Sequence, residues 1–249
     1  MKKLILFVAF LSLLAAFGAA QVYAGNITIF DGQTSGSVGT WTNRGNAPGE
    51  DQEVEPGCVG AQVWDLEAFV LTGKNLSIIG GYNFKDGVAD PYRPPLIYKS
   101  GDIFISTTGG AYDYAIKMVI GETSGSYQIY EIDGNSTSSV YFAQNSASNP
   151  WKLILASNQA SVGGGTLTYL TGLTDAETGF DGGLHNIVTL LDLPDYLLVN
   201  NALFHYTYEC GNDNLMGLAP VPIPPTALLL GSGLVGLGLL GRRRRKNTI

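Results

Sequence analysis

The stretch Gln62-Val63-Trp64-Asp65-Leu66-Glu67-Ala68-Phe69-Val70 alternates apolar and polar side chains with a period of two. In an extended chain, one face would carry Trp64, Leu66, Ala68 and Val70, and the other would carry Asp65 and Glu67. This pattern predicts a β-strand with one buried face.

The same alternation recurs along most of the chain. Residues 112–120 repeat it with Tyr112, Tyr114, Ile116, Met118 and Ile120 on one side. Nine further apolar runs lie at residues 76–79, 103–105, 127–132, 140–143, 152–156, 166–170, 186–191, 196–199 and 203–210. Glycine-rich turns such as Gly80-Gly81 and Asp181-Gly182-Gly183 separate them, and no stretch of the central region shows a helical period. We therefore predict an all-β fold, an antiparallel β-sandwich of jelly-roll-like type.

Charge is distributed unevenly along the 249 residues. All 21 acidic residues fall between Asp31 and Asp213, whereas seven of the 14 basic residues lie at the two ends of the chain. Residues 25–220 hold the other seven basic residues and all 21 acids, which gives a net charge of −14. Such a surface repels polyanions, so we expect no nucleic-acid partner.

The N-terminus has the three parts of a secretory signal. Lys2 and Lys3 precede an apolar stretch, which ends in small residues before Gly25. We expect signal peptidase to cut between Ala24 and Gly25, so that residues 1–24 are the signal peptide. A cut after Ala20 and an uncleaved anchor are the alternatives.

The C-terminus, residues 218–249, also has three parts. A proline motif at residues 221–225 is formed by Val221, Pro222, Ile223, Pro224 and Pro225. An apolar run at residues 226–241 follows, and a basic stop at residues 242–246 contains Arg242, Arg243, Arg244 and Arg245. As a helix the apolar run would span about 24 Å, a short transmembrane helix. The arginines would stay on the cytoplasmic side, which leaves the acidic ectodomain, residues 25–217, outside.

This tail resembles the PEP-CTERM sorting signal of Gram-negative bacteria, with Val-Pro-x-Pro-Pro in place of Pro-Glu-Pro. The resemblance implies export across the inner membrane and transient anchoring there, followed by handling by an exosortase near the proline motif. It also implies a final location at the cell surface or in a matrix of exopolysaccharide. Residues 205–217 look like the closing segment of ectodomains in such proteins. A plain C-terminal membrane anchor is the alternative.

Cys58 and Cys210 are the two cysteines of the chain. Export to an oxidising compartment favours a disulfide between them. On the chain-entropy view, this bond would stabilise the domain by up to roughly 5 kcal/mol.

Catalytic motifs are absent from the sequence. There is no GxSxG, HExxH or Walker sequence. His185 and His205 fall on different predicted strands and are interpreted as half-buried strand residues; pairing His185 with Asp181 or Asp192 would be arbitrary. Asp65 and Glu67 form the best carboxylate pair for glycoside hydrolysis. The simpler interpretation is that they are solvated outward residues.

Calcium is the one cofactor with any support, and we predict no metal site. Asp133-Gly134-Asn135 and the pair Asp86 and Asp90 offer oxygen ligands, but residues of these types are also ordinary turn formers. The leading hypothesis is an exported, non-enzymatic protein with a structural or adhesive role beside exopolysaccharide. A secreted carbohydrate-active enzyme, either a glycoside hydrolase or a lyase, and a sugar-binding module are the alternatives.

Overall fold

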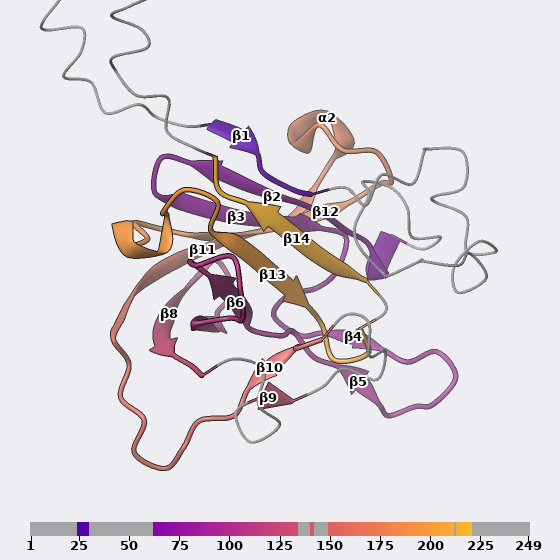
Figure 1. Ribbon diagram of the computed structural model, residues 1–249. Coiled ribbons are helices and arrows are strands. Elements are labelled where there is room, and N and C mark those ends of the chain that lie inside the picture. The colour runs from indigo at the N-terminus through magenta and orange to yellow at the C-terminus, as the bar shows by residue number, and fades with distance from the viewer. Residues whose placement is uncertain (1–23, 30–61, 134–139, 142–148, 212, 221–249) are drawn as a thin grey trace, which may run out of the picture. The chain divides into compact units, whose positions relative to one another are not determined.

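The computed structural model describes residues 24–29, 62–133, 140–141, 149–211 and 213–220. They belong to one compact unit, Tyr23–Pro220, whose regular secondary structure is mostly antiparallel strand (Figure 1). The all-β antiparallel prediction is confirmed. The strands are β1 (Ala24–Asn26), β2 (Leu66–Thr72), β3 (Asn75–Gly80), β4 (Val88–Ala89), β5 (Ile97–Tyr98), β6 (Ile103–Ser106), β7 (Tyr114–Ile120), β8 (Ser124–Glu131), β9 (Val140–Tyr141), β10 (Lys152–Leu153), β11 (Gly163–Leu173), β12 (His185–Leu190), β13 (Leu203–Thr207) and β14 (Asn214–Leu218). The helical segments are η2 (Gln62–Trp64), α2 (Asp175–Thr178) and η4 (Asp195–Leu197).

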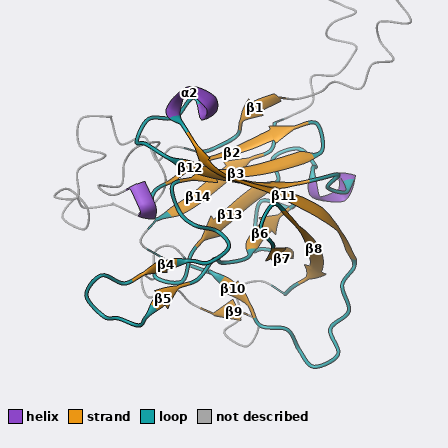
Figure 2. Ribbon diagram, turned by 180° about the vertical axis from the view of Figure 1, so that it is seen from behind, coloured by secondary structure: helices purple, strands orange, loops and turns teal. Residues whose placement is uncertain are grey.

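Ten strands form one curled sheet in the order β1-β2-β3-β12-β11-β8-β7-β6-β13-β14, and two small hairpins, β4–β5 and β9–β10, stand beside it. The jelly-roll-like sandwich stays a prediction. Hairpin neighbours in sequence remain neighbours in the sheet, which favours one continuous ladder (Figure 2).

The two edges of this sheet meet along residues 27–29, which we call the seam. The Ile27 N–H donates to the Phe69 carbonyl of β2 over 2.9 Å. On the other side, the Ile29 N–H donates to the Met216 carbonyl of β14, and the Leu218 N–H donates to the Ile27 carbonyl, both over 2.8 Å. Backbone groups that an open edge would leave exposed are therefore paired.

Aromatic rings dominate the core inside the curl. Tyr82 stacks on Tyr208 with ring centroids 4.5 Å apart and planes 5° from parallel. Their hydroxyls donate to the backbone carbonyls of Tyr98 and Trp64, so each hydroxyl has a hydrogen-bond partner.

A β-bulge changes the face assignment expected for residues 62–70. Leu66 pairs with Gly80 and Ala68 pairs with Ile79, so Glu67 is an extra residue in β2. The alternation shifts by one position beyond it, and Phe69 and Leu71 join Leu66 in the core. The prediction that Ala68 and Val70 share a face with Leu66 is therefore wrong.

Most of the other strand predictions are confirmed. Of the runs 140–143 and 152–156, only residues 140–141 and 152–153 form strands, and residues 142–143 lie outside the described residues. Residues 196–199 were expected to form a strand, but the chain turns there as η4, in which the Leu197 N–H bonds back to the Pro194 carbonyl. The short strands β1, β4 and β5 and the last strand β14 carry too little alternation to be predicted from their residues.

The predictions for the ends of the chain stay predictions. Ala24 and Gly25 lie in β1, while the rest of the signal peptide, Cys58, and residues 221–249 with the sorting signal lie outside the described residues. Within the described ranges, no helix has the length and apolar character needed to cross a membrane.

Candidate functional site

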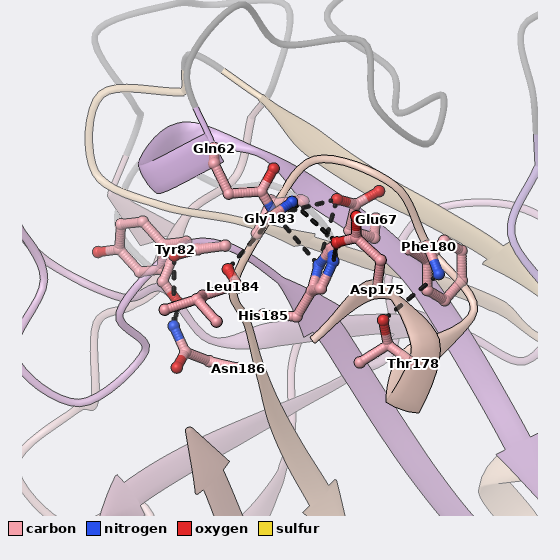
Figure 3. Close-up of polar contacts among 12 residues, drawn as sticks. Gln62, Glu67, Tyr82, Asp175, Thr178, Phe180, Gly183, Leu184, His185 and Asn186 are labelled. Carbon is pink, nitrogen blue, oxygen red and sulfur yellow. Dashed lines mark hydrogen bonds and ion pairs between the residues drawn. The ribbon is translucent and has the colours of Figure 1, made fainter. Parts of the chain in front are cut away.

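Four polar side chains from separate segments meet on the outer face of the sheet (Figure 3). They are Gln62 of η2, Glu67 of β2, Asp175 of α2 and His185 of β12, and we call them the Glu67–His185–Asp175 cluster. Glu67 and His185 are both 0% exposed. These two residues lie far apart in the sequence, and tertiary structure brings them together.

Strand parity places His185 on the outer face. Val188 and Leu190 of β12 point into the core, so His185 points the opposite way. The bulge then turns Glu67 toward the same face, where its Oε1 lies 3.5 Å from His185 Nδ1. A regular strand would have continued the alternation without this extra residue.

Hydrogen bonds hold both nitrogens of the imidazole. The Gln62 amide nitrogen lies 3.1 Å from His185 Nδ1 and 3.4 Å from Glu67 Oε1. Asp175 Oδ1 lies 3.1 Å from His185 Nε2. In the tautomer with its proton on Nε2, the ring accepts from Gln62 and donates to Asp175.

Asp175 links this buried group to the surface, since its side chain is 47% exposed. Its carboxylate accepts the Gly183 N–H over 2.9 Å. That backbone hydrogen bond, followed by the one with His185, holds the pKa of Asp175 below its ordinary value. The segment Thr174-Asp175-Ala176-Glu177 forms a capping box that starts α2 and positions Asp175.

Glycines allow the surrounding backbone to approach Gln62. Gly182 has a φ of 133°, a region that side chains other than glycine rarely adopt, and a Cβ there would overlap the Gln62 amide. A Cβ on Gly81 would overlap the Gln62 carbonyl. The cluster is therefore enclosed by close backbone contacts.

The carboxylate pair predicted for glycoside hydrolysis is not solvated. Asp65 is 1% exposed and Glu67 is 0% exposed. Asp213, also buried, accepts the Leu66 N–H between them over 3.0 Å. The prediction of outward, solvated residues is wrong, because the bulge turns Glu67 toward Gln62 and His185, and the fold buries Asp65 as well.

His205 lies in a different environment from His185. Its ring is buried on β13 and stacks on Tyr112, with centroids 5.5 Å apart and planes 26° from parallel. The acid that meets His185 is Asp175, rather than Asp181 or Asp192. The capping-box sequence at residues 174–177 was the signal that could have drawn attention to it.

The residues considered for calcium are only partly described. Asp90 is buried and accepts hydrogen bonds from its own turn, while Asn135 lies outside the described residues. Over the described ranges, no group of three or more His, Cys, Asp or Glu side chains is arranged to hold a metal ion. A calcium site remains untested.

Cys210 follows β13, is half-buried and packs against the core. The disulfide with Cys58 stays a prediction.

Comparisons with protein-family models, with curated proteins and with solved structures found no match to this chain. Its function must therefore be inferred from its own residues.

Proposed function

We propose that this chain is an exported, non-enzymatic protein of the cell surface or extracellular matrix, with a structural or adhesive role. The signal-like N-terminus, the tripartite C-terminus and the net charge of −14 over residues 25–220 support this assignment. Signal peptidase and an exosortase would process the two ends during export. In this role, the curled sheet would pack its two halves face to face, as the layers of a sandwich do.

The observation that carries the proposal is the use of the cluster as a structural cross-link. Gln62 bonds to both Glu67 and His185, and His185 also bonds to Asp175. These contacts join η2, β2, β12 and α2. Both side chains are enclosed by protein, so a substrate has no access to them in this structure. Groups suited to acid–base chemistry are thereby used to hold segments together.

The course of the chain also suits a tethered protein. Residues 24–29, at the start of the unit, lie beside β14, the last strand of the unit, and the seam hydrogen bonds join them. Both ends of the unit therefore lie together, while the β4–β5 hairpin lies at the other end (Figures 1 and 2).

The sorting step can be tested by mass spectrometry of intact protein from membrane and extracellular fractions. Wild-type protein should lose residues after the proline motif. Replacing Arg242 to Arg245 with serine, or deleting residues 221–225, should leave full-mass precursor in the membrane. A wild-type protein that keeps its C-terminal peptide would instead be a simply anchored one.

A carbohydrate-active enzyme is the second candidate, favoured by the exposed carboxylate of Asp175 backed by an imidazole. Incubation with polysaccharides of the producing cell, followed by a reducing-end assay, tests it. Release of reducing ends that Asp175→Asn abolishes, with Asp195→Asn as the surface control, would replace the structural proposal.

A further inference from the structure

The β4–β5 hairpin carries an exposed surface at residues 91–97, which we call the arm; its last residue, Ile97, begins β5. All seven residues are exposed: Pro91, Tyr92, Arg93, Pro94, Pro95, Leu96 and Ile97. The Tyr92 side chain is the most open of the large apolar residues described, at 89% exposure. Six of these seven residues are apolar or aromatic, more than a hairpin loop needs, which indicates that the arm binds a partner.

The buried carboxylate of Asp90 holds the arm through hydrogen bonds. Asp90 accepts the Tyr92 N–H over 2.8 Å, the Arg93 N–H over 3.1 Å and the Arg93 Nε–H over 2.7 Å. The Tyr98 hydroxyl donates to the same carboxylate over 3.0 Å, and its ring packs edge-on against Trp64. Tyr92 is therefore displayed on a backbone that is already ordered, which lowers the entropy cost of binding.

Charge restricts the partner. Arg93 pairs with Asp90, so the arm has little net charge of its own, and residues 25–220 as a whole repel polyanions. An uncharged partner fits this surface best. Sugar rings offer apolar C–H faces that pack on aromatic rings, and hydroxyls that bond to nearby carbonyls and to the guanidinium edge.

The position of the arm favours a glycan over a lipid surface. In both views the β4–β5 hairpin lies at the end of the unit away from β1 and from the point where the chain leaves β14 (Figures 1 and 2). The arm therefore lies at the end of the unit opposite the one from which the chain continues, where extracellular polysaccharide could reach it, and this step rests on the function proposed above. We propose that the arm is a binding platform for uncharged polysaccharide, with the Tyr92 ring as its stacking surface.

Affinity electrophoresis of the full-length chain in mild detergent tests this platform. Gels containing soluble neutral glucans, one β-1,3-linked and one α-1,4-linked, should retard the protein, whereas alginate should not. Tyr92→Ala should be retarded less, with a dissociation constant about tenfold higher than that of the parent protein. Tyr92→Phe should retain binding, and Val119→Ala, at another exposed apolar residue, should leave it unchanged.

Two results would overturn the platform. One is the absence of retardation by both neutral glucans, or equal retardation of the parent and Tyr92→Ala. The other is protection of the Tyr92–Arg93 bond from chymotrypsin in phosphatidylcholine nanodiscs but not in detergent, which would assign the arm to a lipid surface. Neither result depends on processing of the tail, so failure of the platform and failure of the proposed sorting can be told apart.

Discussion

A buried carboxylate is costly unless hydrogen bonds replace its water, and Glu67 occupies such a position. Gln62 donates to Glu67 Oε1 and to His185 Nδ1, and His185 in turn donates to Asp175. Each residue of the cluster is thus stable in the interior because the next one is present. Loss of any member leaves a polar group buried without its bond.

Replacing Glu67 with alanine should therefore lower the free energy of unfolding by about 2–4 kcal/mol. Glu67→Gln should cost less, because the amide keeps an acceptor oxygen for Gln62. Urea unfolding followed by circular dichroism measures both. The control is Asp195→Ala, which removes an exposed ion pair with Lys74 and should change stability by less than about 1 kcal/mol. Equal effects at Glu67 and Asp195 would contradict the role given to the cluster.

Among the elements, the β4–β5 hairpin is held by one side chain rather than by a long ladder. The two strands contain two residues each, too few to fix the loop between them. Asp90 makes up for this, and its pKa is held below the ordinary value first by the backbone hydrogen bond from Tyr92 and then by Arg93.

Asp90→Ala should release the arm without unfolding the sheet. Chymotrypsin should then cut after Tyr92 at least about tenfold faster than in the parent protein, because local opening exposes the bond. A time course with mass spectrometry detects the cut. Asp86→Ala, at an exposed carboxylate just before β4, is the matched control and should cleave at the parental rate. An unchanged rate for Asp90→Ala would show that the arm is ordered by other contacts.

At the scale of the whole molecule, the seam converts an open sheet into one whose edges are paired. Among the described residues, 27–29 bond to both β2 and β14, and the Leu66 N–H of β2 bonds to Asp213 just before β14, so the closure depends on a few hydrogen bonds. Open edges would be templates for association with other chains.

Ile29→Pro removes the N–H that bonds to Met216 and should lower the free energy of unfolding by about 1–3 kcal/mol. Light scattering should also reveal oligomers as the edges become available. Gly110→Ala is the control, since a Cβ on this exposed residue would meet only the Thr108 hydroxyl, at 3.8 Å. A monomer of parental stability after Ile29→Pro would show that the seam is dispensable.

Acid should destabilise the molecule. The pKa values of Asp90, Asp175 and Glu177 are lowered by hydrogen bonds, so their contributions are present above their unfolded pKa values and are lost as pH falls through the folded ones. Desolvation raises the pKa of buried Asp102, whose contribution has the opposite sign and is lost as pH rises through its folded value. Because three carboxyl groups have lowered pKa values and one has a raised pKa, the urea concentration at the unfolding midpoint should decrease as the pH is lowered below about 4.

Asp175→Asn should flatten this acid limb and Asp102→Asn should steepen it. Urea titrations at pH 7, 5 and 3.5 measure the slopes. A midpoint that rises toward pH 3.5 in the parent protein would contradict the balance of signs.

Local side-chain patterns determined the all-β class and most of the strands, because a period of two is a property of neighbouring residues. They also led to the predictions for the two ends, which stay untested. The bulge at Glu67 could not be predicted in this way, since only pairing with Gly80 and Ile79 reveals the extra residue. The same limit applies to the arm, whose exposure depends on what the rest of the chain leaves uncovered.

The cluster and the seam were decided by tertiary structure alone. Glu67 and His185 are far apart in sequence, and their contact depends on a sheet order that places β3 between β2 and β12. The sequence shows which acids, histidines and aromatic rings the chain carries, but the fold determines which of them are buried and which partners they have. The pattern of an alternating strand predicts that its carboxylates are solvated. Whether another segment buries them, and at what free-energy cost, depends on contacts that form only in the folded chain.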